Sequence, residues 1–273
     1  IKDELGHKNV EVAQIGPAGE NLVRFASIIN MCNRANGRNG TGTVMGSKNL
    51  KALVVKKGKG LKPCDPEKFK EFSKRVVDMI KDNPSIQGLG EFGTDGDLEG
   101  FSDEGFLPTK NWTTGYFPEG AKNITGTTMA ETILKGRDTC YGCAVRCKRV
   151  VEVPGVVDPL YGGPEYETAA AFGSYCGITD LTAVCLANQL CNMYGLDTIS
   201  CGATIAFAME CYEKGILTLE DTDGLELKFG NEKVLPELIK KIVYREGIGA
   251  LLAEGSKRAA KEIGKGAEEL TVE

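Results

Sequence analysis

Three cysteines within a short stretch of the sequence constrain this chain more than any other feature. Cys140, Cys143 and Cys147 stand in the run Thr-Cys-Tyr-Gly-Cys-Ala-Val-Arg-Cys-Lys, which has the spacing C-x2-C-x3-C. Three thiolates this close together can converge on one soft metal centre, either zinc or an iron–sulfur cluster, and each normally takes a fourth ligand. The competing interpretation, three unligated core cysteines, gives no reason for ligand spacing.

Composition excludes several classes of protein. The 273 residues include 33 Lys and Arg and 38 Asp and Glu, so the net charge is −5. This acidic balance argues against nucleic-acid binding, which leaves a basic footprint. No apolar run approaches the roughly 18 residues that span a membrane. Ten cysteines, several of them in apolar helical segments, predict a reducing cytoplasmic setting rather than a disulfide framework.

The chain is expected to divide near residue 62. Residues 1–62 are rich in glycine and contain two β-like runs, at 10–15 and 50–56, which predict the end of a β-rich domain whose beginning is absent. Residues 63–273 read as a helical domain. The predicted fold class is therefore α+β, predominantly α-helical.

Helical periodicity starts at Asp65-Pro66 and continues downstream. After it, residues 83–128 read as irregular, and Gly88–Gly93, although it matches G-x-G-x-x-G, follows no strand and is not expected to bind a dinucleotide. The spacing predicts helices at 129–134, 165–176, 180–194, 198–214, 231–246 and 248–263.

Two further segments carry chemistry and also have plain structural explanations. The glycine-rich stretch 36–49 can present bare amides beside Arg38 to an anionic cofactor, or can simply form a tight turn. In Gly163-Pro-Glu-Tyr-Glu, Glu165 and Glu167 suit the first turn of a helix, while one of them can also handle protons in a pocket. Asp197 can be an N-cap or can accept hydrogen bonds from a ligand.

Taken together, these motifs resemble the aldehyde ferredoxin oxidoreductase family of tungsten- or molybdenum-pterin enzymes. The resemblance runs over nearly the whole chain, and the motifs that carry it are long and occur in the same order. They are Ile15–Glu20, Gly37–Lys51, Leu107–Asn111, the three cysteines, Gly163–Glu167, Tyr194–Ser200 and Tyr244–Gly249.

The resemblance implies a role for each candidate residue. The three cysteines would hold a [4Fe–4S] cluster, and Glu165 would be the proton-handling carboxylate of the active site. Asp197 would contact a bis-pterin cofactor containing tungsten or molybdenum. Asn192 stands where the family has an aspartate in the same D-x-x-G-L-D motif. The glycine-rich loop would lie against the pterin through Arg38, Asn39, Thr41 and Gly42.

The same resemblance implies a larger enzyme. The family's fourth cluster cysteine and its active-site histidine fall beyond residue 273, so this chain is expected to be a central piece that works with the rest of the same enzyme. The whole enzyme would oxidise a small aldehyde to its carboxylic acid and pass electrons through the cluster to ferredoxin. A homodimer is also compatible with the resemblance.

Two alternatives stay open at this point. The first is a non-catalytic electron-transfer or metal-binding module that uses only the three cysteines. The second is a related tungsten reductase subunit that acts on another substrate, such as an aromatic acyl thioester. The Gly-Pro-Glu-Tyr-Glu run favours the aldehyde branch, because the resemblance places the proton-handling carboxylate there.

Overall fold

The N-terminal part of the computed structural model, which describes residues 1–7, 9–56 and 58–272, is built on a small antiparallel sheet. Its strand order is β3-β2-β1-β4. Val10 and Val12 are buried along β1 and alternate with more exposed residues, as expected for a strand with one covered face, whereas Ile15 at its end is buried on the other face. The strands of this sheet are β1 (Val10–Ile15), β2 (Ile28–Asn30), β3 (Arg34–Asn36) and β4 (Ala52–Lys56).

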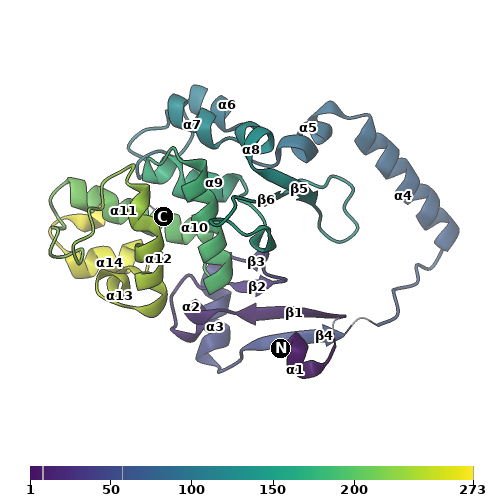
Figure 1. The fold of residues 1–273 in the computed structure, drawn as a ribbon, viewed down its shortest axis with the longest axis horizontal. Helices are drawn as coiled ribbons and strands as arrows, with labels where there is room; N and C mark the ends of the chain where they lie inside the picture. The colour runs from purple at the N-terminus through teal and green to yellow at the C-terminus, as the bar shows by residue number, and fades with distance from the viewer. Residues whose placement is uncertain (8, 57, 273) are drawn as a thin grey trace.

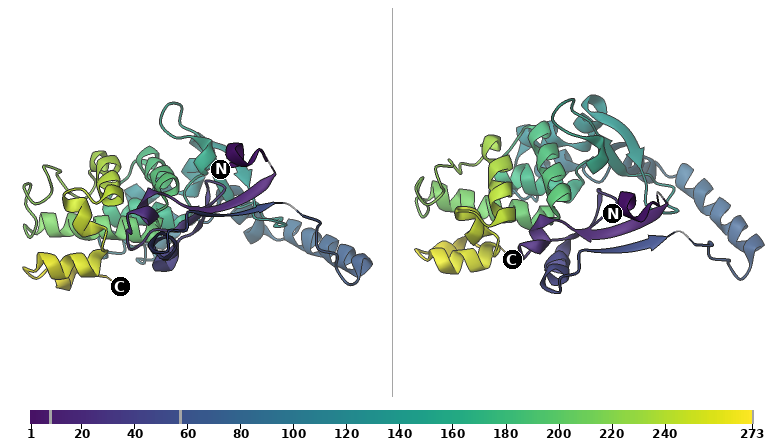
Figure 2. Two further views of the ribbon diagram at one scale, coloured as in Figure 1. Left: turned by 90° about the horizontal axis from the view of Figure 1, so that it is seen from below. Right: turned by 60° about the horizontal axis from the view of Figure 1, so that its bottom comes forward.

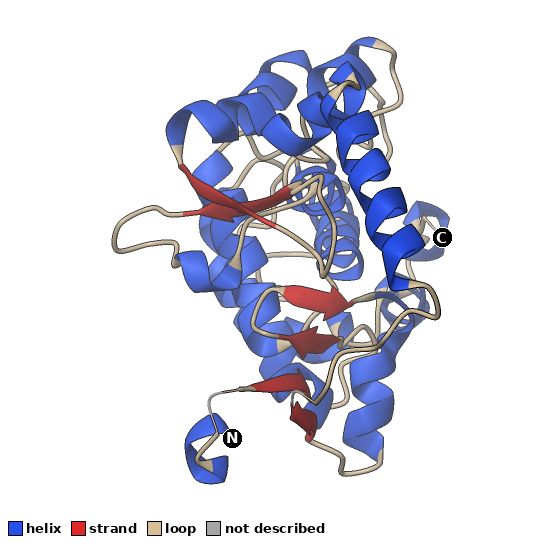
Figure 3. Ribbon diagram, turned by 90° about the vertical axis from the view of Figure 1, so that its right-hand side faces the viewer, coloured by secondary structure: helices blue, strands red, loops and turns tan. Residues whose placement is uncertain are grey.

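A second sheet, a two-stranded hairpin, and many helices make up the rest of the chain (Figures 1 and 3). The hairpin pairs β5 (Leu134–Asp138) with β6 (Lys148–Val151). The helices are α1 (Lys2–Leu5), α2 (Pro17–Glu20), α3 (Thr41–Ser47), α4 (Pro66–Lys81), α5 (Pro84–Phe92), α6 (Leu98–Asp103), α7 (Pro118–Ile124), α8 (Gly126–Thr132), α9 (Tyr166–Phe172), α10 (Leu181–Tyr194), α11 (Thr198–Glu213), α12 (Leu235–Tyr244), α13 (Ile248–Leu252) and α14 (Ser256–Ile263).

The main hydrophobic core surrounds α11. This helix contacts α9 along its length and is buried on nearly every side, so its sequence is apolar all round rather than amphipathic. Helix α12 is amphipathic instead, and its apolar stripe of Leu235, Leu238, Ile239 and Ile242 faces the core. The prediction of an α+β, predominantly helical fold is confirmed.

Helix α4 projects from the body of the molecule and is reached from β4 by an extended linker (Figures 1 and 2). The helix starts as predicted, with Asp65 accepting a hydrogen bond from the Lys68 N–H. Its apolar residues are nevertheless exposed: Phe69 is 60% and Phe72 64% accessible. The domain boundary predicted at residue 62 falls in this linker.

Because α12 packs on the core and α4 does not, replacing an apolar side chain by alanine should destabilise the fold more in α12 than in α4. We expect Leu238→Ala to lower the free energy of unfolding of this 273-residue chain by about 2–5 kcal/mol, because Leu238 is fully buried and leaves a cavity. Phe72→Ala should change it by less than about 0.5 kcal/mol. Urea unfolding followed by circular dichroism measures both. Equal losses would show that α4 packs on the body in solution.

Several features of the local structure differ from the predictions. Residues 83–128 are not irregular, since α5, α6 and α7 lie there; the helices are short and interrupted by glycine, so no long period is visible. The segment 36–49 is not an open loop either: it contains a 3₁₀ turn, η1 (Arg38–Gly40), followed by α3. Strands β2, β3, β5 and β6 were not predicted, because strands of three to five residues carry little pattern.

The sheet and the helical part are joined by backbone hydrogen bonds. The Ser27 N–H donates to the Gly195 carbonyl at 2.8 Å, and the Asp197 N–H donates to the Phe25 carbonyl at 2.9 Å. Gly16 allows this close approach, since a Cβ there would lie 2.1 Å from the Tyr194 carbonyl oxygen.

Within the described residues, no helix combines the length and apolar character that crossing a membrane requires. Residue 273, which ends the predicted second domain, lies outside them.

Candidate functional site

A cavity of about 320 Å³ lies where the sheet, the β5–β6 hairpin and the helical core meet. Four segments far apart in sequence line it: β3 with the residue before it, the connection between β5 and β6, the start of α9, and the turn from α10 to α11. Of the predicted site residues, it is lined by Cys140, Cys143, Cys147, Glu165, Asn192 and Asp197. The fold therefore brings the cysteines, the glutamate and the aspartate to one place.

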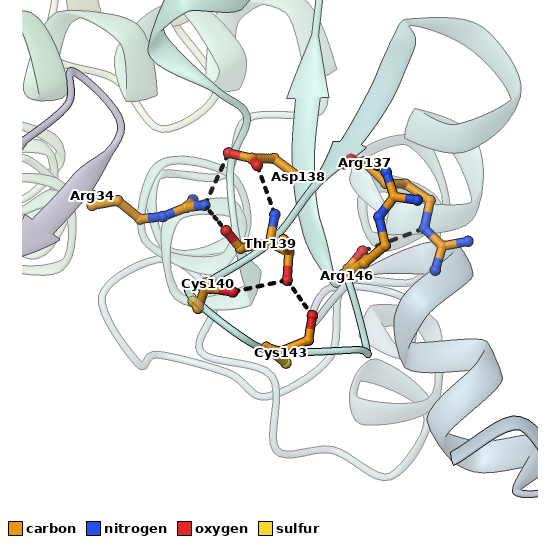
Figure 4. A network of polar contacts seen from close by, with 7 residues as sticks. All are labelled: Arg34, Arg137, Asp138, Thr139, Cys140, Cys143 and Arg146. Carbon is orange, nitrogen blue, oxygen red and sulfur yellow. Dashed lines mark hydrogen bonds and ion pairs between the residues drawn. The ribbon is translucent and has the colours of Figure 1, made fainter. Parts of the chain in front are cut away.

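The connection between β5 and β6, residues 139–147, carries the three cysteines and is folded by its own hydrogen bonds (Figure 4). The Thr139 hydroxyl donates to the Cys143 carbonyl at 2.6 Å and contacts the Cys140 carbonyl at 3.1 Å. The Cys143 N–H donates to the Cys140 carbonyl at 3.0 Å. These bonds close a tight turn between the first two cysteines, so the sulfur-bearing loop has a defined shape before any ligand binds.

Arg34 on β3 holds this loop from the other side of the cavity. Its Nη2 donates to Asp138 Oδ2 at 2.9 Å and to the Thr139 carbonyl at 2.6 Å (Figure 4). Its Nη1 is buried and has no hydrogen-bond partner within the described part of the chain. A buried guanidinium N–H is costly unless it is paired, so this group favours an anionic ligand in the cavity. Sequence reasoning missed Arg34, because a single arginine before a glycine-rich stretch carries no motif.

Arg149 fixes the backbone of Cys147, the third cysteine, by a hydrogen bond to its carbonyl. It is fully buried, and its guanidinium donates to the carbonyls of Cys147 at 2.9 Å, Glu91 at 2.6 Å and Gly90 at 2.7 Å. These contacts tie the end of the cysteine loop to the last turn of α5. The sequence analysis also missed Arg149, because a basic residue next to Lys148 gives no signal of burial.

The Cys147 thiol is less easily ionised than an ordinary cysteine. Burial raises its pKa, and the nearby carboxylate of Glu165 raises it further. Such a thiol releases its proton when a metal cation binds to the sulfur, so metal binding is coupled to proton release. Cys140 and Cys143 are exposed.

Glu165 precedes α9 in an extended conformation at the N-cap position, yet its side chain makes no capping hydrogen bond there. Its Oε2 instead accepts a hydrogen bond from the Thr94 hydroxyl at 2.7 Å. The purely structural interpretation, a carboxylate that caps its own helix, therefore does not describe the side chain. Glu165 and Glu167 both line the cavity.

Asp197 does serve as the N-cap of α11. Its Oδ2 accepts from the Ser200 N–H at 3.0 Å and from the Ser200 hydroxyl at 2.6 Å. The same carboxylate lies 3.7 Å from Arg38 Nε, and it is 5% accessible. Asn192 donates from Nδ2 to the Tyr161 carbonyl at 3.0 Å. Both residues thus have structural roles at the edge of the cavity.

The glycine-rich segment lies outside the lining of this cavity. Arg38 faces a neighbouring hollow and reaches the site only through Asp197. Asn39 has a left-handed backbone, and the Thr41 hydroxyl donates to the Asn36 carbonyl. Gly42 packs against the backbone, since a Cβ there would lie 2.5 Å from the Ser27 carbonyl oxygen. The structure accordingly separates Arg38, Asn39, Thr41 and Gly42 from the cysteine side of the site.

The cysteine loop presents three thiols to the cavity, and thiolates are the ligands that an iron–sulfur cluster takes. Among the described residues, no three histidine, cysteine, aspartate or glutamate side chains converge on one metal-ion position, as structural zinc would need. A [4Fe–4S] cluster places each thiolate on a different iron and so spreads its ligands over a larger body. Three thiols on a preformed loop, with the buried Nη1 of Arg34 opposite, suit such an anionic group.

Comparison with protein families gives two matches. Residues 71–273 match the model for "Aldehyde ferredoxin oxidoreductase, domains 2 & 3". Residues 1–57 match the model for "Aldehyde ferredoxin oxidoreductase, N-terminal domain".

Individual relatives match nearly all of this chain but less than half of their own length. The tungsten-containing aldehyde ferredoxin oxidoreductase of Pyrococcus abyssi is 43% identical over 96% of this chain and 44% of that protein. The aliphatic sulfonate oxidoreductase WOR-like subunit of Pyrococcus furiosus is 36% identical over 94% and 41%. Among solved structures, the active-site complex BamBC of benzoyl coenzyme A reductase with 1,5-dienoyl-CoA superposes with a TM-score of 0.76 and 32% identity, over 98% of this chain and 42% of that one.

Proposed function

This chain belongs to the aldehyde ferredoxin oxidoreductase family, and we propose that it forms the cluster-bearing part of an enzyme that oxidises aldehydes to carboxylic acids. It spans about 44% of the length of the curated tungsten-containing relatives that it matches. The remainder of the same enzyme would complete the site. The observation that carries the proposal is the meeting of three cysteines, Glu165 and Asp197 on one cavity.

We assign the two cofactors to opposite sides of Asp197, which lines the cavity and also contacts Arg38 in the neighbouring hollow. Cys140, Cys143 and Cys147 would hold a [4Fe–4S] cluster, with the free Nη1 of Arg34 available to its sulfides or to the pterin. The pterin would be contacted by Asp197 and Asn192. It would also be contacted by the segment that carries Arg38, Asn39, Thr41 and Gly42. The bound tungsten– or molybdenum–pterin supplies the two-electron chemistry and the oxygen transfer, which no side chain can provide.

The protein's own side chains would orient the substrate and transfer protons. Oxidising an aldehyde with water gives the acid, two protons and two electrons. Glu165 borders the cavity and can take up one of those protons. Cys140 and Cys143 are exposed on this chain, and a cluster held there would pass electrons to an acceptor such as ferredoxin. We place the enzyme in the cytoplasm, in keeping with ten free thiols.

A second candidate, reduction of an aromatic acyl thioester, is supported by the structural likeness to the benzoyl coenzyme A reductase complex. The test is a direct comparison on the purified full-length protein with its metals. Aldehyde-dependent reduction of a viologen dye or ferredoxin supports the proposal. Turnover of an aromatic acyl-CoA with no aldehyde oxidation contradicts it. A protein that holds iron but is inactive with both substrates favours the non-catalytic electron-transfer module.

The cluster assignment makes a separate prediction. Cys143→Ser should reduce the iron content of the full-length protein from about four atoms per chain to a small fraction, because one of four thiolate ligands is lost. Cys64→Ser is the matched control, since Cys64 is also exposed but lies outside the cavity. Iron analysis and the visible absorption of the cluster measure both variants. Full iron content in Cys143→Ser would remove this cysteine from the ligand set.

A further inference from the structure

Thr94 lies in the loop between α5 and α6 and makes two hydrogen bonds to the start of α9. Its Oγ1 accepts from the Tyr166 N–H at 2.9 Å and donates to Glu165 Oε2 at 2.7 Å. The direction of the second bond is fixed, because an amide N–H can only donate and a carboxylate can only accept. The single proton of the Thr94 hydroxyl is therefore committed to Glu165.

The loop that carries Thr94 is held on both sides. The carbonyl of Asp95 accepts hydrogen bonds from the Gly126 N–H at 2.9 Å and from the Thr125 hydroxyl at 3.0 Å. On the other side, buried Arg149 binds the last carbonyls of α5 and the Cys147 carbonyl. Thr94 thus has a fixed place relative to the cysteine loop as well as to α9.

The two oxygens of Glu165 have different surroundings. Oε2 is bound by Thr94, whereas Oε1 has no hydrogen bond to any described residue, although Glu165 lines the cavity. A carboxylate on a free glutamate side chain can rotate about three bonds, and a proton acceptor that is misplaced by about 1 Å can cost about 10²-fold in rate. Anchoring one oxygen leaves the other in one position.

We propose that Thr94 is a positioning residue, which holds Glu165 so that Oε1 faces the substrate side of the cavity. This inference rests on the proposed role of Glu165 in proton transfer. Thr94 acts through Glu165 and not on the substrate itself. The competing explanation is that Thr94 only satisfies the Tyr166 N–H at the start of α9, which would affect the stability of the fold but not the rate of the reaction.

Two substitutions in the full-length enzyme separate these explanations. Thr94→Val keeps the shape and removes the hydroxyl, and we expect kcat to fall about 10- to 100-fold while KM changes by less than about 2-fold. Thr94→Ser keeps the hydroxyl and should stay within about 3-fold of the natural kcat. A purely structural role lowers the melting temperature of Thr94→Val but leaves the kcat of the folded enzyme unchanged, and that result overturns the proposal.

A readout independent of the cofactors is the crystal structure of the metal-free variants. Thr94→Val should show the Glu165 carboxylate displaced or in more than one rotamer, while Thr94→Ser should retain the natural position. An unmoved Glu165 in Thr94→Val overturns the proposal. Glu165→Gln identifies which premise has failed. If Glu165→Gln is also fully active, the proposed function of Glu165 is wrong. If it is inactive while Thr94→Val is normal, only the inference about Thr94 falls.

Discussion

Glu165→Gln will lower the aldehyde turnover of the full-length enzyme by about 10²–10⁴-fold, the usual cost of losing a positioned acid or base. Glutamine keeps the size of the side chain and can still accept the Thr94 hydrogen bond through its carbonyl oxygen, but it cannot exchange a proton near neutral pH. The cysteine loop is untouched, so iron and tungsten content should stay at the natural level. Steady-state kinetics with an aldehyde and a viologen acceptor measure the effect.

Glu119→Gln is the matched control for this experiment. Glu119 lies in the first turn of the short helix α7, is exposed, and does not line the cavity. Its replacement should leave turnover unchanged and alter stability by no more than about 1 kcal/mol. Should Glu165→Gln behave like Glu119→Gln, with near-normal turnover and slightly lower stability, the glutamate supports only the helix terminus and its catalytic assignment is wrong.

Asp95→Asn will stabilise the protein at neutral pH but hardly at pH 4. The Asp95 carboxyl is fully buried, and neither of its oxygens has a hydrogen-bond partner within the described residues. Burial raises its pKa to about 7; its own backbone N–H opposes the rise, nearby Glu165 adds to it, and Arg149 opposes it. Cys185 is a further titratable neighbour. The ordinary pKa of an aspartate is about 3.9.

Whether stability rises or falls with pH depends on whether the folded or the unfolded chain holds the Asp95 proton. Between pH 4 and 7 the folded chain keeps the Asp95 proton while the unfolded chain releases it, so stability falls as pH rises and levels off above about 7. The total loss is on the order of 4 kcal/mol, at about 1.4 kcal/mol for each unit by which the pKa of Asp95 is raised. Asparagine cannot ionise and escapes this loss.

Urea unfolding of the full-length protein between pH 4.5 and 8 measures the difference. Asp103→Asn provides the comparison, since Asp103 is exposed at the end of α6 and its replacement should shift stability by less than about 0.5 kcal/mol throughout. A constant difference between Asp95→Asn and the natural protein over this range would mean that Asp95 is ionised in the folded state. The folded protein in solution would then have to provide a hydrogen-bond donor or a cation for the Asp95 carboxylate.

The sequence revealed those parts of the site that lie in motifs. The cysteine spacing, the Gly-Pro-Glu-Tyr-Glu run and the helix start at Asp197 were visible, because each depends on neighbours along the chain. The long apolar stripe of α12 was equally clear. These features involve local geometry, which sequence periodicity reports directly.

Residues that act across the fold left no such signal. Thr94 reaches Glu165 over 71 positions, and Arg34 reaches Asp138 over 104. Nothing in the sequence near Thr94 or Arg34 distinguishes them from surface residues, because their partners are defined only by tertiary packing. The same reason explains why the sequence did not indicate that Asp197 separates Arg38 from the cavity that the cysteines line.

The contacts between the N-terminal sheet and the last helices delay folding during synthesis. Arg245 donates to the Asn21 carbonyl across 224 positions, and the Arg24 N–H donates to the Ala253 carbonyl. At 5–20 residues per second, a ribosome needs roughly 10–45 s to make the intervening chain. For that time the Asn21 carbonyl and the Arg24 N–H lack their partners on the last helices. The N-terminal part of the fold is therefore completed only after residues 245 and 253 have been made.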